Sequence, residues 1–252
     1  MRFIKSTEYR EFILKMFVLA IGPCFLLLTI GCPKTDDPTT EIAPFISSDF
    51  TELDKITAIS YFRSGCGHDY SDDFETNRSM KHYYEPFGAH RVNDDVKIFS
   101  PVDGQITEIV NEEHGSSVGL KNKQIRIIPS AHHELTIIIF HSDLISAEII
   151  VGKLVTAGEH LAYAHMYYDD IPEYAHDFDI AVRQDVGNGK KRYLSYIELM
   201  TDSLFDSYIA RGADLRSDFV ISKADRDAHP VIDFNDPATD YFPQWVTLNS
   251  LP

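Results

Sequence analysis

The stretch that decides the fold is "VKIFSPVDGQITEIV", at residues 96–110. Two segments rich in β-branched and apolar residues flank the sequence Ser-Pro-Val-Asp-Gly. Pro and Asp-Gly favour tight turns, because Pro presets its own φ and Gly tolerates backbone conformations that other residues avoid. The stretch therefore predicts two strands around a turn at Pro101–Gly104.

The rest of the chain repeats this pattern of short apolar runs separated by turn residues. The runs are "ITAISYF" (56–62), "KQIRIIP" (123–129), "ELTIIIFH" (134–141), "AEIIVGKLVTAGEHLAYA" (147–164) and "FDIAVRQ" (178–184). Such runs are typical of an all-β sandwich or barrel. A helix is expected mainly near the end, where Thr201 can cap "DSLFDSYIARG". We therefore expect a mainly β domain over residues 50–199 and a small helical extension over residues 200–252.

The N-terminal residues predict export. A basic start is followed by "MFVLAIGPCFLLLTI" (16–30), which is shorter than the roughly 20 apolar residues of a membrane span. This pattern predicts a signal peptide over residues 1–31. The end, "LLTIGC", resembles the bacterial lipobox, which implies lipidation of Cys32 and attachment to a cell-envelope membrane through acyl chains. Ordinary cleavage or an uncleaved anchor is the alternative. Residues 32–49, rich in Pro, Thr, Asp and Ser, are expected to form a tether.

Composition excludes several kinds of partner. The formal net charge is −16, whereas nucleic-acid binding depends on basic side chains that neutralise phosphates. We therefore expect no nucleic-acid partner and no adhesion to anionic lipid headgroups. Cys66 is the single cysteine beyond the leader and the lipobox, so the mature domain has no internal disulfide and depends on its hydrophobic core.

Three segments, in this order, resemble the lysostaphin-type zinc metallopeptidases, which cut peptide cross-links in bacterial cell walls. "IFSPVDGQITEIV" resembles the family's strand–turn–strand, "LTIIIFHSDL" its strand ending in a histidine, and "VGKLVTAGEHLAYA" its Val-Gly-x-x-Val-x-x-Gly turn. The resemblance covers roughly residues 80–185 and implies a hybrid β-sandwich, or barrel-sandwich, fold. Lipoyl- and biotin-carrying domains use the same module, but no lysine is centred in a tight hairpin here as an attachment site.

The resemblance also implies a zinc site. The family's first ligands are a His and, four residues on, an Asp; His82 lies at about this place, and His141 matches the histidine that assists catalysis. His68 and Asp72 show the His-x-x-x-Asp spacing themselves. Zinc held by His82 and Asp179, supplemented by His68 or Asp72, would lower the pKa of a bound water for which His141 is the base.

The family pattern is incomplete at two points. Pro86 stands four residues after His82, and the strand that should carry a closing His-x-His reads "HDFDIAV". Two main functions stay open: a lipid-anchored, zinc-dependent peptidoglycan endopeptidase, or a non-catalytic relative that binds the cell wall or a partner. A purely structural envelope lipoprotein is a third.

The stretch "GHDYSDDFETNRSMKHYYEP" (67–86) has plainer interpretations as well. Its acidic residues could form a solvated loop, since acidic runs usually do. Alternatively, Arg78 and Lys81 could neutralise the carboxylates, which would make the stretch an ion-pair network. Cys66, just before it, could be a metal ligand or a thiolate nucleophile.

Overall fold

The computed structural model describes residues 42–112, 117–166 and 177–250. The predicted signal peptide (residues 1–31) and Cys32 lie outside these residues, so their predicted roles stay predictions. Within the described part of the chain, no helix has the length and apolar character needed to cross a membrane.

Strands make up most of the regular structure, which confirms the prediction of a mainly β domain. The strands are β1 (Ile56–Ser60), β2 (His82–Pro86), β3 (Lys97–Phe99), β4 (Gly104–Asn111), β5 (Lys123–Pro129), β6 (Leu135–Leu144), β7 (Leu154–Val155), β8 (His160–Ala164), β9 (Phe178–Asp185), β10 (Lys191–Leu194) and β11 (Trp245–Thr247). The helices are α2 (Asp202–Ile209) and α3 (Lys223–Ala228), with 3-10 turns η1 (Leu53–Lys55), η2 (Gly88–His90), η3 (Ile197–Leu199), η4 (Arg216–Phe219) and η5 (Pro237–Thr239).

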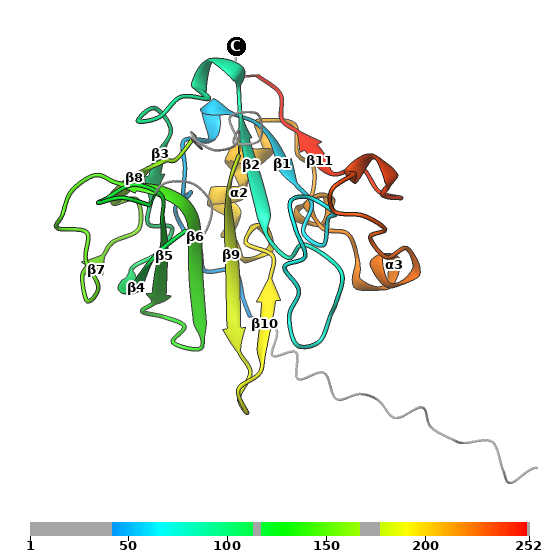
Figure 1. The fold of residues 1–252 in the computed structure, drawn as a ribbon, viewed down its shortest axis with the longest axis horizontal. Helices are drawn as coiled ribbons and strands as arrows, with labels where there is room; N and C mark the ends of the chain where they lie inside the picture. The colour runs from blue at the N-terminus through cyan, green and yellow to red at the C-terminus, as the bar shows by residue number, and fades with distance from the viewer. Residues whose placement is uncertain (1–41, 113–116, 167–176, 251–252) are drawn as a thin grey trace, which may run out of the picture. The chain divides into compact units, whose positions relative to one another are not determined.

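The strands form an antiparallel sheet in the order β11-β1-β2-β9-β6-β5-β4-β7 (Figure 1). Strand β10 pairs with β9, while β8 pairs with both β6 and β3. In the pairing of β2 with β9, Tyr83 lies opposite Asp179 and His82 lies opposite Ile180. In the pairing of β9 with β6, Ile180 lies opposite Ile139. Strand β9 therefore carries Asp179 between the strand that begins at His82 and the strand that holds His141.

The predicted turn lies between β3, which ends at Phe99, and β4, which begins at Gly104. The Ser100 hydroxyl donates to the Val102 carbonyl across this turn, at 2.7 Å. A Cβ on Gly104 would lie 2.5 Å from the Ile128 carbonyl oxygen, so close pairing with β5 requires glycine here. The two strands take different partners, since β3 pairs with β8 and β4 pairs with β5 and β7.

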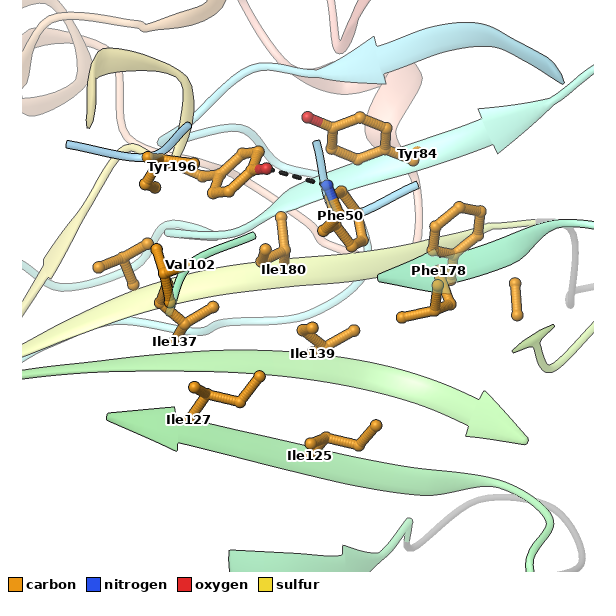
Figure 2. Packing of buried hydrophobic residues seen from close by; sticks show 14 of the residues in the cluster. Phe50, Tyr84, Val102, Ile125, Ile127, Ile137, Ile139, Phe178, Ile180 and Tyr196 are labelled. Atoms are coloured by element: carbon orange, nitrogen blue, oxygen red, sulfur yellow. Dashed lines mark hydrogen bonds between the residues drawn. The ribbon is translucent and has the colours of Figure 1, made fainter. Parts of the chain in front are cut away.

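The main core lies on one face of β5, β6 and β9. Alternate side chains of a strand point to one face, and those of Ile125, Ile137, Ile139 and Ile180 are fully buried together (Figure 2). The intervening residues of β6 and β9 face the other way, where they form a second, smaller cluster. It consists of Ile138, Phe140 and Ala181, with Tyr70 and Tyr193 packed against it. The acidic stretch at 67–86 therefore covers the second face through Tyr70.

The residues on both sides of the predicted domain 50–199 contribute to the same core. Thr201 caps α2 as predicted, accepting a hydrogen bond from the Leu204 amide, and Phe205 and Tyr208 of this helix are buried. Strand β11 pairs with β1 and so adds an edge strand to the sheet. Ile46, from the segment predicted as a tether, is fully buried, and its amide donates to the carbonyl of Leu199.

Candidate functional site

The centre of the site is a buried ion pair. Asp179 is fully buried on the second face of β9, and Lys81, which immediately precedes β2, is 3 % exposed. The Lys81 Nζ lies 2.7 Å from Asp179 Oδ2. The two groups form an ion pair, but their angles do not suit a hydrogen bond. A buried carboxylate is costly without a partner, and the ammonium supplies the opposite charge.

Aromatic rings surround this ammonium group. The Nζ of Lys81 lies 3.9 Å from the ring centroid of Phe140, 4.3 Å from that of Tyr70 and 5.5 Å from that of Tyr83. Ring faces attract a cation within about 6 Å through their quadrupole. Burial, reinforced by the charge of Asp179, raises the pKa of Tyr83 well above its ordinary value, so its phenol stays neutral. The pair is thus held in an apolar aromatic enclosure.

Strand alternation decides that Lys81, and not its neighbour, faces Asp179. In "MKHYY" (80–84), Lys81 and Tyr83 point to the second face, whereas Tyr84 belongs to the main core. His82 shares the parity of Tyr84 and therefore turns away from Asp179. The sequence alone does not reveal this direction, because Tyr83 and Tyr84 are both buried and either could face the main core.

His82 is satisfied inside the protein. It is 1 % exposed; its Nδ1 lies 2.9 Å from the Ser60 carbonyl oxygen, and its Nε2 lies 2.9 Å from the Ser195 hydroxyl. Since a carbonyl can only accept, Nδ1 carries the proton and Nε2 accepts from Ser195. Burial lowers the pKa of His82 to about 4, so the ring is neutral. Both ring nitrogens are therefore engaged, and His82 does not join the predicted ligand set.

His141 does approach Asp179, across a break in the regular pairing of β6. The pairing of β5 with β6 shifts register between Lys123 and Ile125, and such β-bulges redirect side chains. His141 has a φ of 50°, in the left-handed region, as does Asn122, which immediately precedes β5. The His141 Nε2 lies 3.5 Å from Asp179 Oδ1, and its Nδ1 lies 3.3 Å from Asn122 Oδ1. Strained backbone of this kind clusters at functional sites.

His68 and Asp72 separate. The exposed His68 reaches the site, with its Nε2 3.4 Å from the Nζ of Lys81. Asp72 instead accepts hydrogen bonds from the backbone amides of Phe74, Glu75 and Tyr193, at 2.8, 2.8 and 2.9 Å. Its carboxylate therefore ties the loop to β10. Of the predicted ligands and base, His68 lies beside Lys81 and His141 lies beside Asp179, whereas His82 and Asp72 lie elsewhere.

Two further acids border the site. Asp177 is half-buried, and burial together with the charges of Asp179 and Glu85 raises its pKa to about 7. Glu112 accepts from the backbone amide of His141 at 3.4 Å, and its pKa is raised by burial and by the charge of Asp179. Asp177 can therefore change its protonation state near neutral pH.

The basic residues of the stretch 67–86 form ion pairs, as one interpretation of the sequence predicts. Arg78 contacts Glu75 at 2.7 Å and Asp227 at 2.6 Å, while Lys81 holds Asp179. The buried Cys66 has its thiol pKa raised to about 12 by burial, which leaves it protonated at neutral pH and unsuited to act as a thiolate.

The predicted zinc donors do not fit a metal ion in this arrangement. Catalytic zinc takes three protein ligands and one water. Among residues 42–112, 117–166 and 177–250, no group of three or more His, Cys, Asp or Glu side chains is placed to hold a metal. The reason is visible in the donor set: His82 is bonded to Ser60 and Ser195, and Asp179 is paired with Lys81.

No protein-family model matches the chain, and no curated protein matches it. Among solved structures, the chain is similar to the NMR solution structure of lysostaphin, at 16% identity and a TM-score of 0.33, over 53% of this chain and 52% of lysostaphin. It is also similar to the crystal structure of a putative glycyl-glycine endopeptidase LytM from Ruminococcus gnavus, at 17% identity and a TM-score of 0.37, over 47% of this chain and 44% of that one. The chain thus spans about half the length of these two proteins.

Proposed function

We propose that this chain is a cell-envelope protein whose peptidase-like β domain binds peptidoglycan peptides without hydrolysing them. The observation that supports this most is the Lys81 ammonium, which lies 2.7 Å from Asp179 at the point where the predicted zinc would need that carboxylate. The alternative, a zinc-dependent endopeptidase, requires the same carboxylate to be bonded to a metal.

The two cations compete for one group. Zinc bonds a carboxylate oxygen at about 2.0–2.2 Å, so a zinc ion on Asp179 would stand beside the Lys81 ammonium. Two like charges at such a distance repel strongly where water is excluded, and Lys81 is 3 % exposed. The side chain has little room to leave, because Phe140 and Tyr70 enclose its end. Metal binding would therefore need the enclosure to open.

The remaining polar groups suit recognition of a polar peptide. His68 is exposed, the His141 side chain is 19 % exposed, and Asp177 is half-buried, so all three can be reached from solvent. Imidazole and carboxyl groups supply both donors and acceptors for peptide N–H and C=O groups. That the peptide comes from the cell wall is supported by the export signal predicted in residues 1–31 and by the family-like motifs in residues 80–185.

Retention on purified sacculi tests the proposal. We expect the protein to sediment with sacculi and a His68→Ala/His141→Ala variant to lose this retention. His133→Ala, which removes an exposed histidine from the turn between β5 and β6, is the matched control and should bind normally. If the unaltered protein is not retained, the binding proposal is wrong. If adding zinc releases new amino groups from the sacculi, the protein is an enzyme and the non-catalytic proposal is wrong.

The anchor is tested separately, by fractionation of cells. Lipid attachment at Cys32 predicts that the protein sediments with membranes and that Cys32→Ala moves it to the soluble fraction. Equal distribution of the two proteins between the fractions would contradict the lipid anchor and leave the binding proposal untouched.

A further inference from the structure

We infer that the enclosure on the second face of the sheet is a cation site that the chain fills with its own lysine ammonium group. This inference rests on the proposed function in one respect: both proposals require that no metal ion is bound at Asp179. We call this feature the ammonium enclosure; its members are His68, Tyr70, Tyr83, Phe140 and Asp179.

The enclosure combines the groups that recognise a primary ammonium ion. A carboxylate meets the charge at 2.7 Å, and an imidazole nitrogen, the Nε2 of His68, lies at 3.4 Å. The faces of Phe140 and Tyr70 lie within 4.3 Å of the nitrogen, in the range of cation–π attraction. Carboxylate, acceptor nitrogen and aromatic faces together favour an organic ammonium over a divalent metal, which would need further anionic or imidazole ligands at bonding distance.

The side chain of Lys81 holds its own ammonium group in the enclosure through a covalent link to the backbone. The pairing of β2 with β9 puts Tyr83 opposite Asp179, and strand alternation then directs Lys81 to the same face. Because the cation is covalently attached, it cannot dissociate or be removed by a chelator. Its charge compensates the buried Asp179 carboxylate, whose Oδ1 lies 3.5 Å from the His141 Nε2. Lys81 is therefore a positioning residue for His141, acting through Asp179.

The chemical class of the occupant follows from the side chain itself. Cutting Lys81 back to alanine removes three methylene carbons and the ammonium nitrogen, which together have the size and charge of n-propylammonium. Buried cavities that cannot collapse take up small molecules that match their shape and polarity. Lys81→Ala should consequently turn the ammonium enclosure into a binding site for free n-propylammonium.

The experiment is a rescue by this cation, read as thermal stability of the otherwise unaltered protein. We expect Lys81→Ala to lower the melting temperature and millimolar n-propylammonium chloride to restore much of the loss, with no effect on the unaltered protein. The uncharged analogue 1-propanol and zinc chloride alone should restore much less. The NMR signals of the His141 ring should shift in the variant and return when n-propylammonium is added, which a merely structural role does not predict.

Three results would overturn the inference. The first is the absence of any stabilisation of the variant by n-propylammonium beyond that of the unaltered protein. The second is equal rescue by 1-propanol, which would mean that the site lacks preference for charge, and the third is stronger rescue by zinc. If Lys81→Ala does not fold alone, refolding with and without n-propylammonium gives the same decision, since no recovery overturns the inference. Failure of sacculus retention leaves this result unchanged, so the two proposals fail separately.

Discussion

Replacing Lys81 by methionine tests the buried ion pair in energetic terms. Methionine keeps an unbranched side chain of similar length but removes the charge, and it leaves Asp179 without its cation. Asp179 is fully buried and Lys81 is 3 % exposed, so solvent screens neither partner. Breaking one side of such a pair costs about 3–5 kcal/mol, because the other charge is left uncompensated. For a domain of this size that corresponds to a fall in melting temperature of roughly 10 °C.

The double variant Lys81→Met/Asp179→Leu separates the ion pair from packing. Replacing both charges of a buried pair by apolar groups is often neutral or stabilising, so we expect the double variant to be more stable than Lys81→Met alone. Urea unfolding followed by circular dichroism gives the free energy of unfolding of all four proteins, and their double-mutant cycle gives the coupling energy. A cost below about 1 kcal/mol for Lys81→Met, as for an exposed pair, would refute the reasoning, and so would additive single effects.

Three other predictions concern His82, its partner Ser195, and Asp177. Burial lowers the pKa of His82 from 6.5 to about 4, so on acidification the unfolded chain takes up a proton before the folded protein does. Between pH 7 and 5 the free energy of unfolding should therefore fall by about 2 kcal/mol more than that of His82→Gln, as measured by urea titration. Ser195→Ala should cost about 1–3 kcal/mol by leaving the His82 Nε2 unsatisfied, whereas the exposed Ser207→Ala should cost almost nothing. The Asp177 pKa is raised from 3.8 to about 7, so the ionised carboxylate destabilises the folded state at high pH. Asp177→Asn should therefore stabilise the protein at pH 7 and above, and this gain should vanish below pH 3.8, where the carboxyl is protonated in both states.

The strands were predictable because each run carries its own local signal. The Ser-Pro-Val-Asp-Gly turn and the cap at Thr201 act within a few residues, and both occur in the structure where the sequence placed them. The continuous apolar run in residues 134–141 likewise reflects burial of β6 on both faces. Local chemistry of this kind needs no knowledge of the strand partners.

The site was harder to predict, because it depends on which strands become neighbours. The family resemblance suggests His82, but the direction of its side chain follows from the parity of β2 relative to β9. The sequence predicts Lys81 only as a possible neutraliser of nearby carboxylates, because its partner Asp179 lies far along the chain. The approach of His141 depends on a left-handed residue at a bulge, which no residue pattern in β6 announces.

The most direct measurement is a crystal structure of the protein grown with excess zinc chloride, with diffraction data on both sides of the zinc absorption edge. We predict that the Lys81 Nζ lies within ion-pair distance of Asp179 Oδ2 and that no anomalous peak appears within reach of Asp179, His68 or His141. An anomalous peak bonded to Asp179, with the Lys81 side chain turned out of the aromatic rings, would contradict the view that an ammonium group takes the place of the metal.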